Sequence, residues 1–254
     1  MTRTTPNPSP TIRVSADYAS TSRAAAEHIT QRAEAAVAAR DVFTLVLAGG
    51  STPKRLYELL AADPLRERMP WDQTHLFWGD ERFVPPEHEA SNYRMAQETL
   101  IDHVPLPPDH IHPVPTNLDS PSEAAAAYEA ALQAFFNTHA DTTAFDCVLL
   151  GLGTDGHTAS LFPEDAPHAS PDTNSWVRAV TAPPRHTPRQ RVTLTLPALN
   201  QAREALFLVS GAQKRDAVQA VLEQTDLSLP AAHVAPRETL TWFVDEAAYG
   251  ARDA

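Results

Sequence analysis

Apolar residues in this chain fall into short continuous runs, separated by longer stretches in which they recur every three or four positions. The runs at 42–48, 75–79, 146–150, 206–210 and 240–244 have the length and composition of buried strands. The stretches at 17–40, 53–60, 91–100, 123–138 and 217–222 have the period of amphipathic helices. Strands that alternate with helices predict an α/β fold with a doubly wound, mostly parallel sheet flanked by helices.

Weaker patterns fill the rest of the chain. Residues 12–14, 176–180 and 191–196 read as shorter strands, and 102–115, with five prolines and three histidines, as an irregular crossover with a short strand around Ile111. The histidines of that crossover, His103, His110 and His112, are interpreted as surface loop residues rather than metal ligands. Residues 1–10, with three prolines, predict a disordered tail before a single domain over 11–250.

Glycine placement gives the first indication of a site. Seven of the eight glycines stand at the ends of predicted strands or in the turns directly after them: 49, 50, 79, 151, 153, 156 and 211. In open α/β sheets the ligand crevice lies outside the carboxyl ends of the strands. We therefore expect four strand ends to meet at a binding site.

Charge limits the ligand. The formal net charge of −12 argues against nucleic acid and against membrane surfaces, which are met by clustered lysine and arginine. An anionic ligand would need its positive contacts gathered in one cleft. The single cysteine, Cys147, excludes an intrachain disulfide framework, and with no secretory or long apolar segment we predict a cytoplasmic protein.

The turn Gly49-Gly50-Ser51-Thr52-Pro53 follows one predicted strand and opens a helix. Backbone amides and two hydroxyls at a helix N-terminus favour a phosphate, and Thr52 before Pro53 resembles an N-cap. An ordinary tight turn is the alternative. The spacing is not that of a nucleotide P-loop.

Two further groups follow strands. Asp80-Glu81-Arg82 offers an arginine for a phosphate or an oxyanion and an aspartate for a sugar hydroxyl, with a solvated charge cluster as the alternative. Arg191 and Lys214 belong to segments that approach the same sheet edge, although either could be an ordinary surface cation.

Asp155-Gly156-His157 carries the sharpest chemical prediction. We expect His157 at a helix N-terminus, where the dipole disfavours the imidazolium and leaves a general base, with Asp155 steering the ring or the water. A capping aspartate with a structural histidine is the alternative. A metal is disfavoured for lack of further ligands at helical or hairpin spacing, and a nucleophilic Ser160 for lack of G-x-S-x-G.

Taken together, these motifs resemble the 6-phosphogluconolactonase family over about residues 15–248. The resemblance rests on an ordered set of segments: Leu47-Ala-Gly-Gly-Ser-Thr-Pro53, Trp78-Gly-Asp-Glu-Arg82, Ser91-Asn-Tyr-Arg-Met95, Gly151-x-Gly-x-Asp-Gly-His-Thr-Ala-Ser-Leu-Phe-Pro163, Arg191-Val-Thr-Leu-Thr195 and Leu240-Thr-Trp-Phe-Val-Asp-Glu-Ala247.

The resemblance implies a Rossmann-like fold and hydrolysis of 6-phospho-D-glucono-1,5-lactone in the pentose phosphate pathway, with no cofactor and no metal. It implies catalytic roles for His157, Asp155 and Arg82, and substrate contacts from Gly50, Ser51, Thr52, Asp80, Asn92, Gly156, Arg191 and Lys214. Whether Arg185 or Arg189 shares the phosphate stays open. The expected partner is the phosphorylated lactone, and the expected state is a monomer, with a dimer as the alternative.

Two other functions remain. An amino-sugar phosphate deaminase or sugar-phosphate isomerase would share the Asp-Gly-His element but continue with a glutamate in an Asn-Glu-Pro context, where this chain has Leu161-Phe-Pro-Glu164. A catalytically silent sugar-phosphate sensor is the third possibility, against which the complete Asp-Gly-His set argues.

Overall fold

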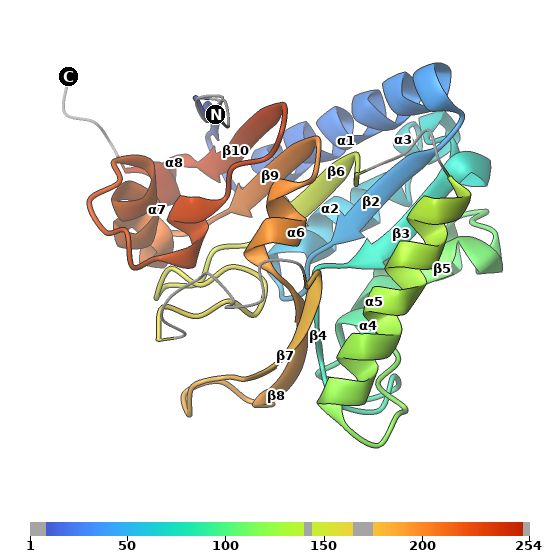
Figure 1. Ribbon diagram of the computed structural model, residues 1–254. Helices are drawn as coiled ribbons and strands as arrows, with labels where there is room; N and C mark the ends of the chain where they lie inside the picture. The colour runs from blue at the N-terminus through green and yellow to red at the C-terminus, as the bar shows by residue number, and fades with distance from the viewer. Residues whose placement is uncertain (1–8, 140–143, 165–174, 251–254) are drawn as a thin grey trace, which may run out of the picture.

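A seven-stranded parallel sheet forms the centre of the molecule (Figure 1). The computed structural model describes residues 9–139, 144–164 and 175–250. The strand order is β1-β10-β9-β6-β2-β3-β5, where the strands are β1 (Thr11–Ser15), β10 (Thr239–Asp245), β9 (Glu204–Val209), β6 (Cys147–Leu150), β2 (Phe43–Leu47), β3 (Thr74–Trp78) and β5 (Ile111–His112). The predicted mostly parallel α/β fold is confirmed.

The four inner strands β9, β6, β2 and β3 are buried along their whole length. Continuous burial explains why their sequences are apolar without alternation, since helices cover both faces of such a sheet. These four are also the strands that end in the glycines at 211, 151, 49 and 79, so the expected meeting of four strand ends is confirmed.

Helices connect the strands at the predicted places. The long ones are α1 (Tyr18–Arg40), α2 (Thr52–Leu60), α4 (Asn92–Thr99), α5 (Pro121–Thr138) and α7 (Arg215–Leu222). The Asp17 carboxylate accepts from Ser20 N at 2.7 Å and caps α1, which ends where Asp41 takes a left-handed conformation. Among the described residues, no helix is both long and apolar enough to cross a membrane.

A second, antiparallel sheet was not predicted. Its order is β4-β8-β7, formed by β4 (Asp80–Arg82), β8 (Gln190–Leu194) and β7 (Val177–Thr181), and Figure 1 shows it extending from the end of β3 alongside α5. The sequence indicated β7 and β8 as strands, but β4 is three residues long and polar. Because β4 pairs with β8 in register Arg82↔Arg191, two distant arginines come side by side.

Short helices account for the other differences. The structure adds α3 (Leu65–Arg68), α6 (Leu196–Asn200) and α8 (Glu246–Tyr249), of which α6 ends the predicted strand 191–196 early because Thr195 Oγ1 caps it. Residues 1–8 of the predicted tail at 1–10 lie outside the described residues.

Candidate active site

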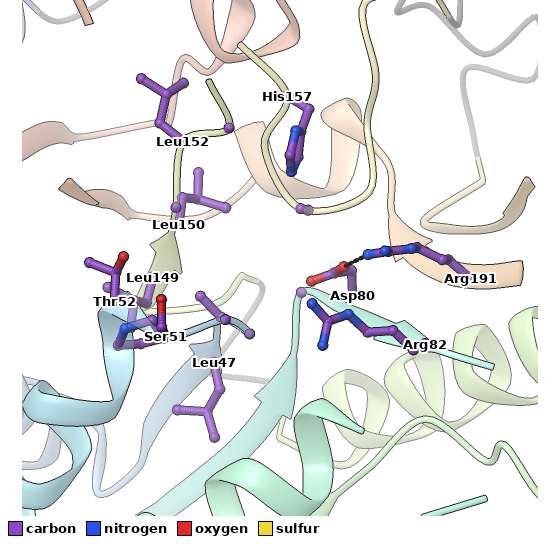
Figure 2. Close-up of a pocket in the computed structure, with 18 of the residues that line it drawn as sticks. Leu47, Ser51, Thr52, Asp80, Arg82, Leu149, Leu150, Leu152, His157 and Arg191 are labelled. Carbon is purple, nitrogen blue, oxygen red and sulfur yellow. Dashed lines mark ion pairs between the residues drawn. The ribbon is translucent and has the colours of Figure 1, made fainter. Parts of the chain in front are cut away.

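A cleft of about 220 Å³ opens at the carboxyl ends of the inner strands. Figure 2 shows Ser51 and Thr52 on one side, Asp80, Arg82 and Arg191 on the other, and His157 facing the space between them. The lining residues come from the glycine turns and the strands before them: Leu47 to Pro53, Gly79, Asp80, Arg82, Leu149 to Gly153, His157, Ala159, Arg191 and Lys214. Segments far apart in the chain therefore supply one cavity.

Two buried tyrosines fix the strand ends beneath this cleft. The Tyr57 hydroxyl donates to Ala48 O at 2.8 Å and accepts from Ala48 N at 3.0 Å, and the Tyr128 hydroxyl makes the same pair of bonds with Trp78. Burial raises the pKa of both phenols, so they stay neutral. Each satisfies backbone groups where its strand leaves the sheet. No sequence pattern points to this role, because each tyrosine lies on a helix and is 9 or 50 residues away from the strand end that it contacts.

The turn at 49–53 meets the cleft as expected. Gly50, with φ of +93°, turns the chain, and Gly50, Ser51 and Thr52 line the cavity at the start of α2. The expected N-cap at Thr52 is wrong. Ser51 occupies the cap position with a helical backbone and no side-chain bond, and Thr52 is already the first helical residue. Both hydroxyls are thus left without a capping role.

Asp80 sits at the bottom of the cleft, buried and already hydrogen-bonded. Its carboxylate accepts from Ser160 Oγ at 2.7 Å, and Arg191 Nη1 lies 3.9 Å away. Asn92 donates from Nδ2 to Asp80 O at 2.8 Å. Asn92 is 1% exposed and does not line the cleft, so its contact with substrate stays a prediction. It supports the Asp80 backbone.

Glu81 faces away from the cleft and holds the N-terminus of α4. Its two oxygens accept backbone N–H groups of Arg82, Asn92 and Tyr93, each at 2.7 Å. Burial raises the pKa of Glu81 to about 7, against the lowering effect of these bonds. The acidic neighbour of Arg82 is therefore structural.

Three cations line the cleft: Arg82, Arg191 and Lys214. Arg82 Nη1 donates to Ala90 O at 2.8 Å, while its buried Nε has no hydrogen-bond partner within the described ranges. Burial lowers the pKa of both Arg191 and Lys214, and Lys214 ends the short 3-10 helix η4 (Ala212–Lys214) that follows Gly211 and leads into α7. Positive charge gathered in one cleft of an acidic protein matches the expectation for an anionic ligand.

His157 does not stand at a helix N-terminus, so that expectation is wrong. Residues 151–163 form a loop closed by its own backbone, in which Gly153 N donates to His157 O at 2.8 Å and Thr158 Oγ1 donates to Gly151 O at 2.9 Å. Gly156 turns with φ of +79°, and a Cβ on Gly153 would lie 2.0 Å from His157 Nδ1. The two glycines let the loop bring Asp155 and His157 together.

The carboxylate of Asp155, rather than a helix dipole, determines the tautomer of His157. Asp155 Oδ1 lies 2.5 Å from His157 Nδ1. Burial opposes ionisation of Asp155, yet hydrogen bonds from His157 and Arg185 outweigh it and hold the pKa of this carboxyl well below its usual range. An ionised carboxylate only accepts, so in the neutral ring Nδ1 carries the proton and Nε2 keeps its lone pair.

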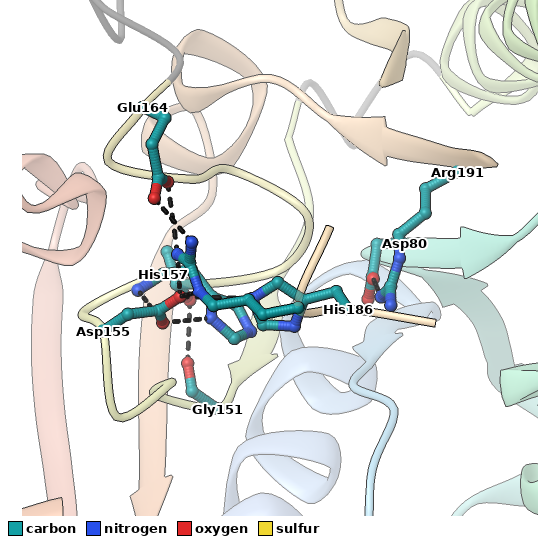
Figure 3. A network of polar contacts seen from close by, with 9 residues as sticks. Asp80, Gly151, Asp155, His157, Glu164, His186 and Arg191 are labelled. Atoms are coloured by element: carbon teal, nitrogen blue, oxygen red, sulfur yellow. Dashed lines mark hydrogen bonds and ion pairs between the residues drawn. The ribbon is translucent and has the colours of Figure 1, made fainter. Parts of the chain in front are cut away.

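The second oxygen of Asp155 is held by the loop between β7 and β8 (Figure 3). Arg185 Nη2 lies 2.5 Å from Asp155 Oδ2 and also contacts Glu164, while His186 Nε2 lies 3.2 Å from the same Oδ2. Neither Arg185 nor Arg189 lines the cleft, and Arg189 Nε donates to Ala182 O instead. No sequence signal points to His186, because a loop sequence does not show which carboxylate the loop covers.

Asp155, His157 and His186 bring one ligand-type atom each within 4.8 Å of the others, as no other group of such side chains does in the described part of the chain. The Arg185 guanidinium already occupies Asp155 Oδ2 and would repel a cation there. The donor set therefore fits a hydrogen-bonded network better than a metal centre.

Comparison with known proteins shows which family the chain is similar to. The family model described as "Glucosamine-6-phosphate isomerases/6-phosphogluconolactonase" matches residues 16–242. A 6-phosphogluconolactonase from Nostoc sp. is 39% identical over 94% of this chain and 96% of its own, and one from Synechocystis sp. is 41% identical over 87% and 89%. The solved 6-phosphogluconolactonase from Trypanosoma brucei is 31% identical with a TM-score of 0.80, covering 94% and 97% of the two chains.

A monomeric glucosamine-6-phosphate deaminase has the same fold, with a TM-score of 0.78 over 94% of this chain and 98% of its own, at 21% identity. The family model spans the chain from α1 into β10 and includes the strands and loops that form the cleft. This chain belongs to the glucosamine-6-phosphate isomerase/6-phosphogluconolactonase family.

Proposed function

We propose that the protein hydrolyses 6-phospho-D-glucono-1,5-lactone to 6-phospho-D-gluconate. One observation carries the proposal: the Asp155–His157 pair stands at a cleft that also holds Arg82, Arg191 and Lys214. A base with a fixed tautomer suits attack by water, and clustered cations suit a phosphorylated substrate. The curated relatives that bear the lactonase name cover nearly the whole chain, which supports the same assignment.

In the chemical step, His157 Nε2 takes a proton from a water molecule whose oxygen attacks the lactone carbonyl carbon. The tetrahedral intermediate then breaks its bond to the ring oxygen, which receives the proton from the imidazolium. The other product group is a carboxylic acid, which ionises. Asp155 stays ionised throughout, holding Nδ1–H and stabilising the positive ring.

Charge that develops on the carbonyl oxygen needs donors already in place. Arg82 and the backbone amides of the glycine turns are the groups available at the cleft. We assign the phosphate to Arg191, Lys214 and the start of α2, where Ser51 and Thr52 present free hydroxyls. No step requires a metal or a cofactor.

The residues after His157 favour lactonase over deaminase chemistry. Leu161 and Phe162 are buried, and Glu164 projects to the surface, where Arg185 binds it. Within the described part of this loop, residues 151–164, no carboxylate therefore replaces the glutamate that the deaminase loop would bring. A silent sensor is disfavoured because the base retains both its carboxylate and its place at the cleft.

A coupled assay tests the proposal. Glucose-6-phosphate dehydrogenase generates the lactone, and 6-phosphogluconate is measured with and without this protein. Since the lactone opens spontaneously, the expected result is acceleration over that background. Equal rates in both arms would refute the assignment, and release of ammonia from glucosamine 6-phosphate would move it to the deaminase.

We also propose that the protein acts as a monomer. The large hydrophobic side chains exposed among the described residues are Val14, Leu118 and Leu227, from three separate segments. Scattered single residues do not make an apolar patch of interface size. Light scattering after size exclusion at assay concentrations measures the mass, and a dimer mass would correct this proposal.

A further inference from the structure

We infer that the loop between β7 and β8 contains two positioning residues, Arg185 and His186, which act on the base through Asp155. The inference rests on the proposed function, because it assigns roles around His157. Its starting observation is that the two oxygens of the Asp155 carboxylate have different partners. Asp155 Oδ1 accepts from His157, and Asp155 Oδ2 accepts from Arg185 and His186.

Contacts from another segment are needed to orient the Asp155 carboxylate, because its own segment constrains the side chain little. It lies in the loop 151–158, outside helix and strand, and its side chain is partly exposed. A carboxylate with two free torsions would otherwise sample several orientations, and only some of them meet His157 Nδ1. Contacts to Oδ2 fix the plane of the carboxylate and with it the direction of Oδ1.

Arg185 supplies the stronger of the two contacts. Its Nε and Nη2 lie 3.1 and 2.5 Å from Asp155 Oδ2, and Nη1 lies 2.6 Å from Glu164 Oε1. One planar guanidinium thus joins the loop after β7 to two points on the Asp-Gly-His loop. Paired, charge-assisted bonds of this kind specify orientation as well as adding energy.

His186 adds a second contact and a packing surface. Its ring centroid lies 5.0 Å from that of His157 and 4.9 Å from that of Phe162. The loop itself is anchored, since Ala182 N donates to Arg189 O at 2.7 Å and the strands on either side pair from Val177↔Leu194 to Thr181↔Gln190. The second sheet therefore provides a rigid base from which Arg185 and His186 reach the catalytic pair.

A purely structural role for Arg185 would be weak. Its side chain is 44% exposed and that of Glu164 is 53% exposed, and ion pairs at such sites contribute little to stability. Arg68 offers a matched control: it is 40% exposed, makes a paired contact to Glu34 at 3.0 and 3.1 Å, and does not line the cleft.

The test compares Arg185→Gln with Arg68→Gln in the lactone assay. We expect Arg185→Gln to lower kcat about 10-fold with KM within about 2-fold, because the base is misaligned while substrate contacts remain. Arg68→Gln should match the wild type. A rise in KM with kcat unchanged would overturn the inference and place Arg185 on the phosphate.

A double-mutant cycle asks whether Arg185 acts through Asp155. In the Asp155→Asn background, Arg185→Gln should have almost no further effect on kcat. Full additivity would contradict the inference. For His186, the Gln variant keeps an N–H donor and the Phe variant keeps only the ring, so kcat should survive in His186→Gln and fall in His186→Phe. Equal rates in these two would remove His186 from the assignment.

A spectroscopic measurement judges the inference even if the lactonase proposal fails. Long-range ¹H–¹⁵N spectra report the tautomer of His157, assigned by the loss of its signals in His157→Gln. The wild type should show one Nδ1–H tautomer and Arg185→Gln a mixture. An unchanged tautomer in Arg185→Gln sinks the positioning role, whereas an inactive wild type sinks only the proposed reaction.

Discussion

Two groups of histidines, at opposite ends of the central sheet, differ in the groups that surround the imidazole ring. At the carboxyl ends of the strands, His157 and His186 share the carboxylate of Asp155 beside an open cleft. At the amino ends, three histidines contact the Phe135 ring and a fourth, His110, contacts His75. We call this group the histidine stack: His75, His110, His112 and His139.

In the histidine stack, the neighbours of each imidazole are other imidazoles. In the active-site pair, His157 and His186, the neighbour is a carboxylate. His75 Nδ1 and His112 Nε2 lie 3.1 Å apart, and the His112 ring stacks on Phe77 at 4.5 Å. Burial, together with the neighbouring histidines, lowers the pKa of His75 to about 3 and that of His112 to about 4. The His75 and His112 rings remain neutral and serve as packing, whereas His157 is the residue that we propose as the base.

The largest expected effect on kcat comes from replacing one histidine of each group and comparing the two variants. His157→Ala should lower kcat by about 10²–10⁴-fold, the usual worth of a general base, with KM changed much less. His112→Gln, in the histidine stack, should leave kcat unchanged. Steady-state kinetics on both variants, with thermal unfolding to confirm folding, check the contrast. Wild-type turnover in His157→Ala would end its assignment as the base.

A smaller loss should follow from removing the carboxylate that distinguishes the two groups. Asp155→Asn keeps the shape but loses the charge that fixes Nδ1–H. We expect kcat to fall about 10²-fold, less than the ~10⁴-fold known for a fully buried triad aspartate, because this pair is partly exposed. The ratio of kcat values measures it. A variant as active as the wild type would show that His157 needs no orienting partner.

The comparison also explains what the sequence reveals. The four buried strands and their glycines can be read directly, because a fully covered parallel strand must be apolar and a sharp turn after it favours glycine. Asp155 and His157 are found because they are two residues apart. His186 and Tyr128 are not found, since their contacts lie 31 and 50 residues away in sequence.

Two of the three histidines of the crossover differ from the prediction. The proline-rich composition predicts His110 and His112 as surface residues, yet they join His75 and His139 in the histidine stack. His103 is exposed, as expected. Composition describes a segment's average exposure, whereas the short β5 strand, which pairs with β3, decides which of its side chains turn inward.

The next prediction concerns the contribution of a cleft cation to KM for substrates with and without a phosphate. Lys214→Gln should raise KM for the phosphorylated lactone about 10-fold, since a charge-assisted contact to phosphate is lost, while kcat changes little. Unphosphorylated glucono-1,5-lactone, which lacks the phosphate, should show no such rise. A loss of kcat with KM intact would move Lys214 into the chemical step.

The smallest expected effect lies in the histidine stack and concerns stability against pH. Folding lowers the pKa of His112 from an ordinary value of about 6.5 to about 4, so between these values the unfolded chain binds a proton that the folded chain does not. The stabilising contribution is therefore complete above about pH 6.5 and is lost as the pH falls toward 4.

His112→Gln removes this titration while keeping a polar group near His75. Its Tm should fall less than that of the wild type between pH 7 and pH 5, by about 2–4 °C. His103→Gln, the same change at an exposed histidine, should track the wild type. If calorimetry gave parallel Tm curves for all three proteins, His112 would not be held neutral by the fold. Its difference from the carboxylate-paired His157 would then rest on geometry alone.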